Sequence, residues 1–88
     1  MAAPPPSNTK GFGDDRYRGM IALLVDARRA ASLSQNALAT KLRRHQQFVS
    51  RYETGERRLD VVEYVDIARA LGIDPAAVVG GVPPTSTG

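Results

Sequence analysis

Residues 33–58 constrain the fold more than any other part of the chain, because two short helical patterns follow each other almost without a connection. Residues 35–42 and about 46–52 each repeat small and apolar side chains at a spacing of three or four, which lines one face of a helix. The inward-facing positions are Leu38, Ala39, Leu42, Val49 and Tyr52. Only residues 43–45 join the two patterns, so we expect a tight turn and two helices that cross near a right angle.

Two helices joined in this way form a helix-turn-helix, whose second helix can enter the major groove of DNA. Its outward positions are candidate base contacts: Gln46, Gln47, Ser50 and Arg51. Gln46 and Gln47 occupy the first turn, which enters the groove most deeply, and a glutamine can bond N6 and N7 of adenine together. Arg51 lies on the same side as Gln47 and can reach a guanine or a phosphate. Phe48 has two interpretations, contact with a thymine methyl group or packing against the helix at 35–42.

Positive charge is concentrated on the same stretch of the chain. Residues 41–58 contain six lysines and arginines against two glutamates, which gives this segment +4, whereas the whole chain carries +3. Candidate phosphate contacts flank the second helix: Arg43, Arg44, His45, Arg57 and Arg58. Gln35 opens the helix at 35–42, where its side chain and backbone N–H can meet a phosphate. His45 would contribute when protonated at low pH.

These residues resemble the Cro/phage-repressor family of helix-turn-helix proteins, also called the xenobiotic-response-element family, over about residues 17–79. The matching positions are Leu33-Ser34-Gln35, Leu38-Ala39, residues 49–53, Gly55, Arg57-Arg58 and residues 67–73. The resemblance implies an all-α, compact five-helix bundle that binds double-stranded DNA as a transcription regulator. It also implies that Arg28 forms a structural salt bridge with Glu53 and aims its guanidinium towards the DNA phosphates.

The turn departs from the family pattern. Where the family has Gly, an apolar residue and then Ser or Thr, this chain has Arg43, Arg44 and His45. We therefore expect Arg43 to adopt a left-handed backbone conformation at some energetic cost, and the second helix to lack its usual side-chain cap.

A longer helix is predicted before the motif, from Asp14 or Asp15 to about Ala31. Its core-facing stripe, at helical spacing, is Met20, Leu24, Ala27 and Ala31. Further apolar residues make the helix more hydrophobic than this stripe requires: Ile21, Leu23 and Val25. They indicate either a wider buried face or contact with a partner chain.

Capping residues define the remaining helix ends. Ser34 is the expected cap of the helix at 35–42, and Gly55 the expected left-handed end of the second motif helix. Asp60 with Glu63 forms a capping box for a fourth helix that ends at Gly72. The inward positions of that helix are Val61, Tyr64, Val65, Ala68 and Leu71. A fifth helix starts with Pro75 as its first residue, and the residues expected to close the core are Ile73 and Val78.

These patterns divide the chain into three parts. Residues 1–15 are expected to form a flexible N-terminal arm, residues 16–79 the DNA-binding domain, and residues 80–88 a flexible C-terminal tail.

Composition excludes several classes of function. The chain has no cysteine and a single histidine, and its carboxylates are scattered, so we predict no metal, no cofactor and no enzymatic activity. The longest apolar run, residues 20–25, is far shorter than the ~20 residues of a membrane-spanning helix. No secretory signal is evident at the N-terminus, so we expect a cytoplasmic protein with no membrane association.

The prediction is a sequence-specific DNA-binding transcriptional regulator, a repressor, that reads the major groove with the helix at about 46–52. One such domain reads only a few base pairs, so we expect a homodimer on a pseudopalindromic site. The fifth helix, the C-terminal tail and the apolar flank of the first helix are all candidate dimer contacts. The alternative function is an antitoxin-like or adaptor module whose main partner is another protein.

Overall fold

The computed structural model describes residues 15–83. This part of the chain is all-α, without strands, as predicted. Its helices are α1 (Asp15–Ala30), α2 (Gln35–Leu42), α3 (Gln46–Thr54), α4 (Val61–Ala70) and α5 (Pro75–Gly80). The predicted N-terminal arm lies outside the described residues except for Asp15, and the predicted C-terminal tail except for residues 80–83.

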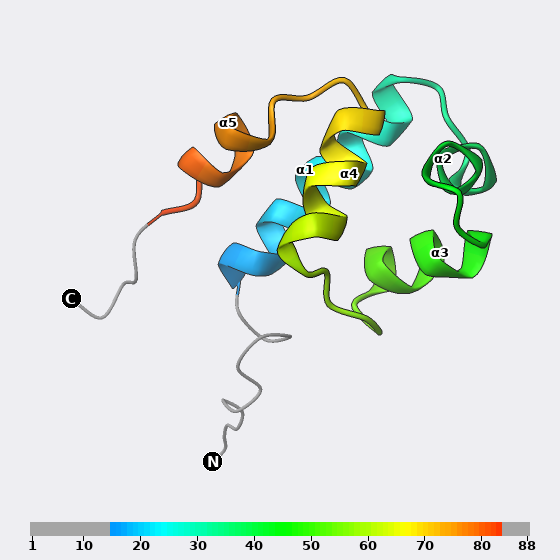
Figure 1. Ribbon diagram of the computed structural model, residues 1–88. Helices are drawn as coiled ribbons and strands as arrows, with labels where there is room; N and C mark the ends of the chain where they lie inside the picture. Colours follow the sequence, from blue (N-terminus) through cyan, green and yellow to red (C-terminus); the bar gives the residue numbers. More distant parts are fainter. Residues whose placement is uncertain (1–14, 84–88) are drawn as a thin grey trace, which may run out of the picture.

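The helices form a small bundle with the helix-turn-helix at one side (Figure 1). The main contacts join α2 with α3 and α4, α1 with α3, and α4 with α5. In Figure 1, α4 crosses in front of α1, and α5 lies on the opposite side of the bundle from α2 and α3. The face of the motif is therefore well separated from α5.

Local capping explains where α2 and α4 begin. The Ser34 side chain accepts a hydrogen bond from the Ala37 N–H, at 2.9 Å. Asp60 accepts from the Glu63 N–H at 2.7 Å, and the Glu63 carboxylate accepts from the Asp60 N–H at 3.0 Å, which completes the predicted capping box. Gly55 and Gly72 have φ of 91° and 76°, the left-handed conformation expected at their helix ends.

The turn between α2 and α3 has both predicted irregularities. Arg43 has φ 59° and ψ 41°, and its N–H bonds the Thr40 carbonyl at 3.1 Å. His45 precedes α3 in an extended conformation and makes no side-chain cap. The start of α3 therefore depends on packing against the rest of the bundle rather than on local capping.

The core lies where α1, α2, α3 and α4 meet. Its side chains with at most 1% exposure are Leu24, Leu38, Ala39, Val49, Tyr52, Ile67 and Ala68. Most of the predicted inward positions belong to this core or pack partly buried against it. Ala39, predicted to face inward, is 1% exposed on α2, which packs against α3 and α4.

Two positions predicted to face the core are exposed, Ala31 and Val61. Ala31 lies beyond the end of α1 and is exposed, whereas Ile21 is buried, so the buried face of α1 is rotated towards Ile21, Leu24 and Arg28. Val61 is 76% exposed in the first turn of α4, beside Val62, which is 68% exposed. Of the extra apolar residues of α1, Val25 packs partly buried against the core and Leu23 stays 54% exposed.

No helix in the range 15–83 is long and apolar enough to span a membrane.

Candidate nucleic-acid interface

The exposed side of α3 carries most of the predicted base contacts. Gln46, Gln47 and Arg51 are exposed and Ser50 is half-buried, whereas Val49 on the opposite side is fully buried. The helix is thus anchored by its apolar face and presents amide and guanidinium donors to solvent. These groups suit hydrogen bonding to base edges in a major groove.

A polar network links this surface to the interior of the protein. Gln46 Nε2 donates to Gln35 Oε1 at 3.3 Å, and Gln35 Nε2 donates to Glu53 Oε1 at 2.9 Å. Because Gln35 begins α2 and Gln46 begins α3, the network joins the two helix N-termini. Sequence reasoning treated Gln35 as a phosphate contact and missed its bonds to both other side chains.

The network ends in the ion pair that the family resemblance implied. Arg28 Nε lies 2.7 Å from Glu53 Oε2, and Arg28 Nη2 donates to Glu53 Oε1 at 3.0 Å. The two side chains are 9% and 7% exposed. The hydrogen bond with Glu53 raises the pKa of Arg28 against the opposing effect of burial, so the guanidinium remains charged. The pair ties α1 to the C-terminal half of α3.

Arg28 does not fit its second predicted role as a phosphate contact. Its Nη1 donates to the Leu33 carbonyl at 2.8 Å, so each of its guanidinium nitrogens already donates within the protein. The side chain is buried and engaged, and a phosphate would have to displace these bonds.

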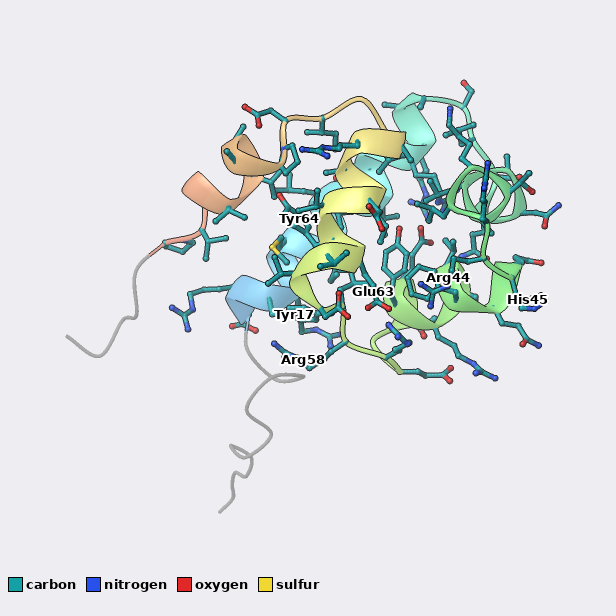
Figure 2. All side chains as sticks on the ribbon, in the orientation of Figure 1. Tyr17, Arg44, His45, Arg58, Glu63 and Tyr64 are labelled. Atoms are coloured by element: carbon teal, nitrogen blue, oxygen red, sulfur yellow. The ribbon has the colours of Figure 1, made fainter. Side chains whose placement is uncertain are left out.

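The predicted phosphate-binding residues fall into two groups. Arg43, His45 and Arg58 are exposed, and the Arg58 guanidinium lies over the Tyr17 ring, 4.2 Å from its centre. Figure 2 shows His45 at the outer end of α3, whereas Arg44 points between α3 and α4 towards Glu63. The direction of Arg44 was not expected from the sequence.

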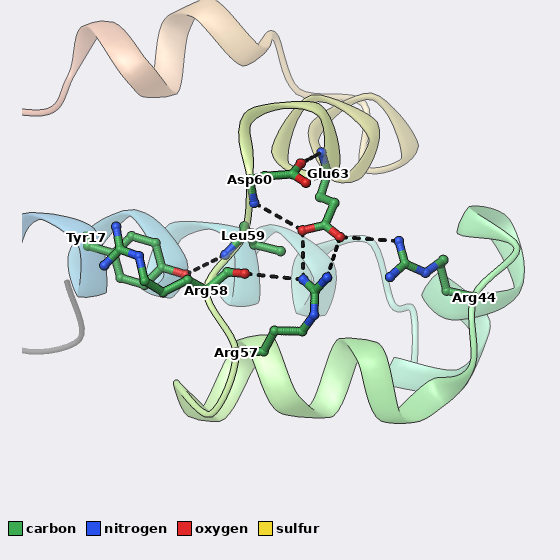
Figure 3. Close-up of polar contacts among 7 residues, drawn as sticks. All are labelled: Tyr17, Arg44, Arg57, Arg58, Leu59, Asp60 and Glu63. Carbon is green, nitrogen blue, oxygen red and sulfur yellow. Dashed lines mark hydrogen bonds and ion pairs between the residues drawn. The ribbon is translucent and has the colours of Figure 1, made fainter.

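Glu63 gathers two arginines that sequence reasoning had assigned to phosphates. Arg57 Nη1 and Nη2 each donate to one Glu63 carboxylate oxygen at 2.7 Å, and Arg44 Nη1 lies 3.5 Å from Glu63 Oε2 (Figure 3). The Arg57 hydrogen bonds are the main reason that the pKa of Glu63 falls to about 2, with the Asp60 N–H and the Arg44 charge acting in the same direction. Sequence reasoning found only the capping role of Glu63.

Phe48 packs inside this cluster rather than standing on the groove-facing side. Its side chain is 8% exposed, with the Arg44 guanidinium 3.9 Å and the Arg57 guanidinium 5.0 Å from the ring centre. The Tyr52 ring centre is 5.5 Å away. Phe48 is buried, but these three neighbours lie outside the helix at 35–42 that the packing interpretation named. A thymine contact would require the ring to leave them.

No group of three or more His, Cys, Asp or Glu side chains within residues 15–83 could hold a metal ion.

The fold and this surface together define a helix-turn-helix protein with an exposed polar face on its second helix. Residues 22–79 match the helix-turn-helix domain family. The chain is also similar to the solved structure of an XRE-family like protein from Pseudomonas syringae pv. tomato str. DC3000. The two share 43% sequence identity and superpose with a TM-score of 0.78, over 88% of this chain and 94% of that chain. A comparison with curated proteins gave no match.

The chain therefore belongs to the helix-turn-helix family and is a DNA-binding regulator of the Cro/XRE type. This confirms the resemblance drawn from the sequence.

Proposed function

We propose that this regulator binds DNA sequence-specifically and acts as a repressor, with α3 in the major groove. The observation that carries the proposal is the exposed pair Gln46 and Gln47 in the first turn of α3, on a helix whose opposite face is fully buried. Arg51 and Ser50 follow on the outer side and complete the proposed base contacts. Their hydrogen-bonding groups can distinguish base pairs by their major-groove edges.

Affinity would come mainly from residues that meet phosphates around α3. Gln35 at the N-terminus of α2 is half-buried, and Arg43, His45 and Arg58 are exposed. Contacts of this kind fix the protein on the duplex and make binding salt-dependent, whereas base contacts provide specificity. A cytoplasmic location is part of the same proposal.

A single copy reads few base pairs, so we propose a homodimer on a pseudopalindrome with half-sites about 34–36 Å apart. The exposed apolar side chains Leu23 and Val79 support contact with another chain, since each is more than half exposed. They also support the second candidate function, an antitoxin-like or adaptor module bound to another protein.

The test is selection from random oligonucleotides at near-physiological salt. The wild type should enrich a palindrome, and Gln46→Ala/Gln47→Ala should lose preference at defined positions, by about 1–3 kcal/mol for each lost bidentate contact. Arg51→Ala should alter other positions of the site. Arg69→Ala removes the same charge from an exposed position on α4, outside the motif, and should leave the selected sequence unchanged.

Absence of any enriched sequence in the wild type, with binding lost as salt rises, would contradict sequence-specific recognition. Stoichiometric co-purification of another protein would then favour the adaptor function.

A further inference from the structure

Glu63 contacts the chain on both sides of the recognition helix. Arg44 lies in the turn before α3 and Arg57 in the segment after it, and both guanidinium groups reach the carboxylate of Glu63 on α4 (Figure 3). Arg57 is held by two bonds of 2.7 Å, and Arg44 by one contact of 3.5 Å. Glu63 is therefore a common acceptor for the two segments that flank α3.

The Glu63 carboxylate is also held by the backbone of its own helix end. Its Oε1 accepts the Asp60 N–H at 3.0 Å, which ties it to the first turn of α4. The Glu63 side chain is 12% exposed, whereas Arg44 and Arg57 are 40% and 39% exposed. The acid is thus covered by two arginines whose outer parts remain open to solvent.

Phe48 lies against both guanidinium groups. Arg44 and Arg57 lie 3.9 Å and 5.0 Å from the centre of its buried ring. Since a planar guanidinium can stack on a ring and form two parallel bonds to a carboxylate, both contacts of Arg57 restrict its orientation. A phosphate would have to compete with Glu63 and Phe48 for the same donors.

We propose that Glu63 is a positioning residue that withholds Arg57, and more weakly Arg44, from DNA phosphates and so limits nonspecific binding. The inference rests on the proposed function, because it assumes that the face around α3 meets DNA. Glu63 itself touches no base or phosphate in this scheme. It leaves Gln46, Gln47 and Arg51 to contribute a larger share of the binding free energy.

The test compares Glu63→Gln with the wild type on an unrelated duplex, over a range of salt concentrations. Glutamine keeps an oxygen for the Asp60 N–H but removes the negative charge. The variant should bind the unrelated duplex several-fold more tightly. The slope of log K against log salt should steepen by about 0.9 for each arginine released, so by about 0.9–1.8.

Asp66→Asn is the matched control. Asp66 is exposed on the same helix, one turn beyond Glu63, and forms no ion pair with the residues of the described range. The control removes the same charge and should leave the slope nearly unchanged. Equal steepening in both variants would mean a general charge effect and would overturn the proposal.

Arg57→Gln provides a second test, and its arm in the wild-type background does not need the Glu63 variant to fold. In the wild-type background it should leave the salt slope unchanged, because Arg57 does not contact phosphate. In the Glu63→Gln background it should remove about 0.9 of the gained slope. A fall of about 0.9 in the wild-type background would show that Arg57 contacts phosphate beside Glu63, and would overturn the proposal.

A measurement without DNA separates this inference from the proposed function. Glu63→Gln and Arg57→Gln should each lower the Tm, and the double variant should fall little further because both remove one interaction. Independent Tm losses would overturn the ion pair itself. Failure of the wild type to select a DNA sequence would count only against sequence-specific recognition, since the salt slopes and the Tm values remain measurable.

Discussion

At the scale of single residues, the two glutamates that bind arginines, Glu53 and Glu63, differ in how deeply their ion pairs are buried. Glu53 and Arg28 have side chains 7% and 9% exposed, whereas Arg57, the partner of Glu63, is 39% exposed. A charge left unpaired in a buried site loses hydration without compensation, but a half-exposed arginine can return to water. The Arg28–Glu53 pair should therefore matter mainly for the stability of the fold. The Arg57–Glu63 pair should matter mainly for how much positive charge the surface presents.

Glu53→Gln should lower the free energy of unfolding by about 3–5 kcal/mol, because it strands the buried charge of Arg28. Denaturant unfolding monitored by circular dichroism measures the change. Glu56→Gln, at an exposed position in the segment that follows α3, should change stability by less than about 0.5 kcal/mol. A loss below about 1 kcal/mol in Glu53→Gln would show that the pair behaves like a surface contact.

Glu63 should make stability depend on pH in the acid range. Its pKa in the folded protein is about 2, lowered from 4.5 mainly by Arg57, so the folded state favours the charged carboxylate. The contribution is therefore complete above about pH 4.5 and is lost as the pH falls towards 2. As the pH falls from about 4.5 to 2, the Tm measured by thermal unfolding should decrease less for Glu63→Gln than for the wild type. Parallel decreases would contradict this assignment.

At the scale of elements, the turn between α2 and α3 is the least favourable local structure of the motif. Arg43 has φ 59° and the N-terminus of α3 has no side-chain cap, yet the turn places α2 and α3 in contact. Packing of Val49 and Tyr52, both fully buried, compensates for these local costs. The motif here is stabilised by its tertiary contacts more than by its turn sequence.

Arg43→Gly should raise stability by about 0.5–1 kcal/mol. Glycine removes a left-handed penalty of about 1–2 kcal/mol, partly offset by the additional backbone entropy it loses on folding. Lys41→Gly in the last turn of α2 removes the same charge from a helical position and should cost about 1 kcal/mol. Chemical denaturation of both variants checks the difference in sign, and destabilisation by both would contradict strain at Arg43.

At the scale of the whole molecule, the large exposed apolar side chains of the described residues lie on α1, α4 and α5. Leu23, Val61, Val62 and Val79 are all more than half exposed. Val61 and Val79 line one groove formed by α1, α4 and α5, together with Tyr17, Met20, Leu59 and the proposed phosphate contact Arg58. Figure 1 shows α5 on the side of the bundle opposite to α2 and α3. A contact with a second chain at this end would leave the surface of α3 accessible.

Two copies should bind one palindromic duplex. Sedimentation equilibrium, at concentrations well above the Kd, measures the stoichiometry. Three variants test the candidate dimer contacts by replacing an exposed apolar side chain with a polar one: Leu23→Gln, Val61→Gln and Val79→Gln. Any variant that weakens binding of the second copy identifies the helix that contacts it. One copy per duplex under these conditions would contradict the proposed homodimer.

The amino-acid sequence by itself determined the features that depend on neighbouring residues. Ser34 and Asp60 cap helices through bonds to residues three positions later, and Gly55 ends α3 because it tolerates a left-handed conformation. The left-handed Arg43 followed from the family resemblance, because Arg43 stands where the family has Gly. Helical spacing likewise predicted most of the core, since residues three and four apart share a face in any helix.

Only the tertiary structure decided which partner each exposed or half-exposed side chain takes. Arg44 and Arg57 were equally compatible with phosphate contacts, and Phe48 with a thymine contact, but all three meet near Glu63. Gln35 similarly joins Glu53 to Gln46. A long side chain can reach many acceptors, and the arrangement of α2, α3 and α4 in the bundle determines which acceptor lies within hydrogen-bonding distance.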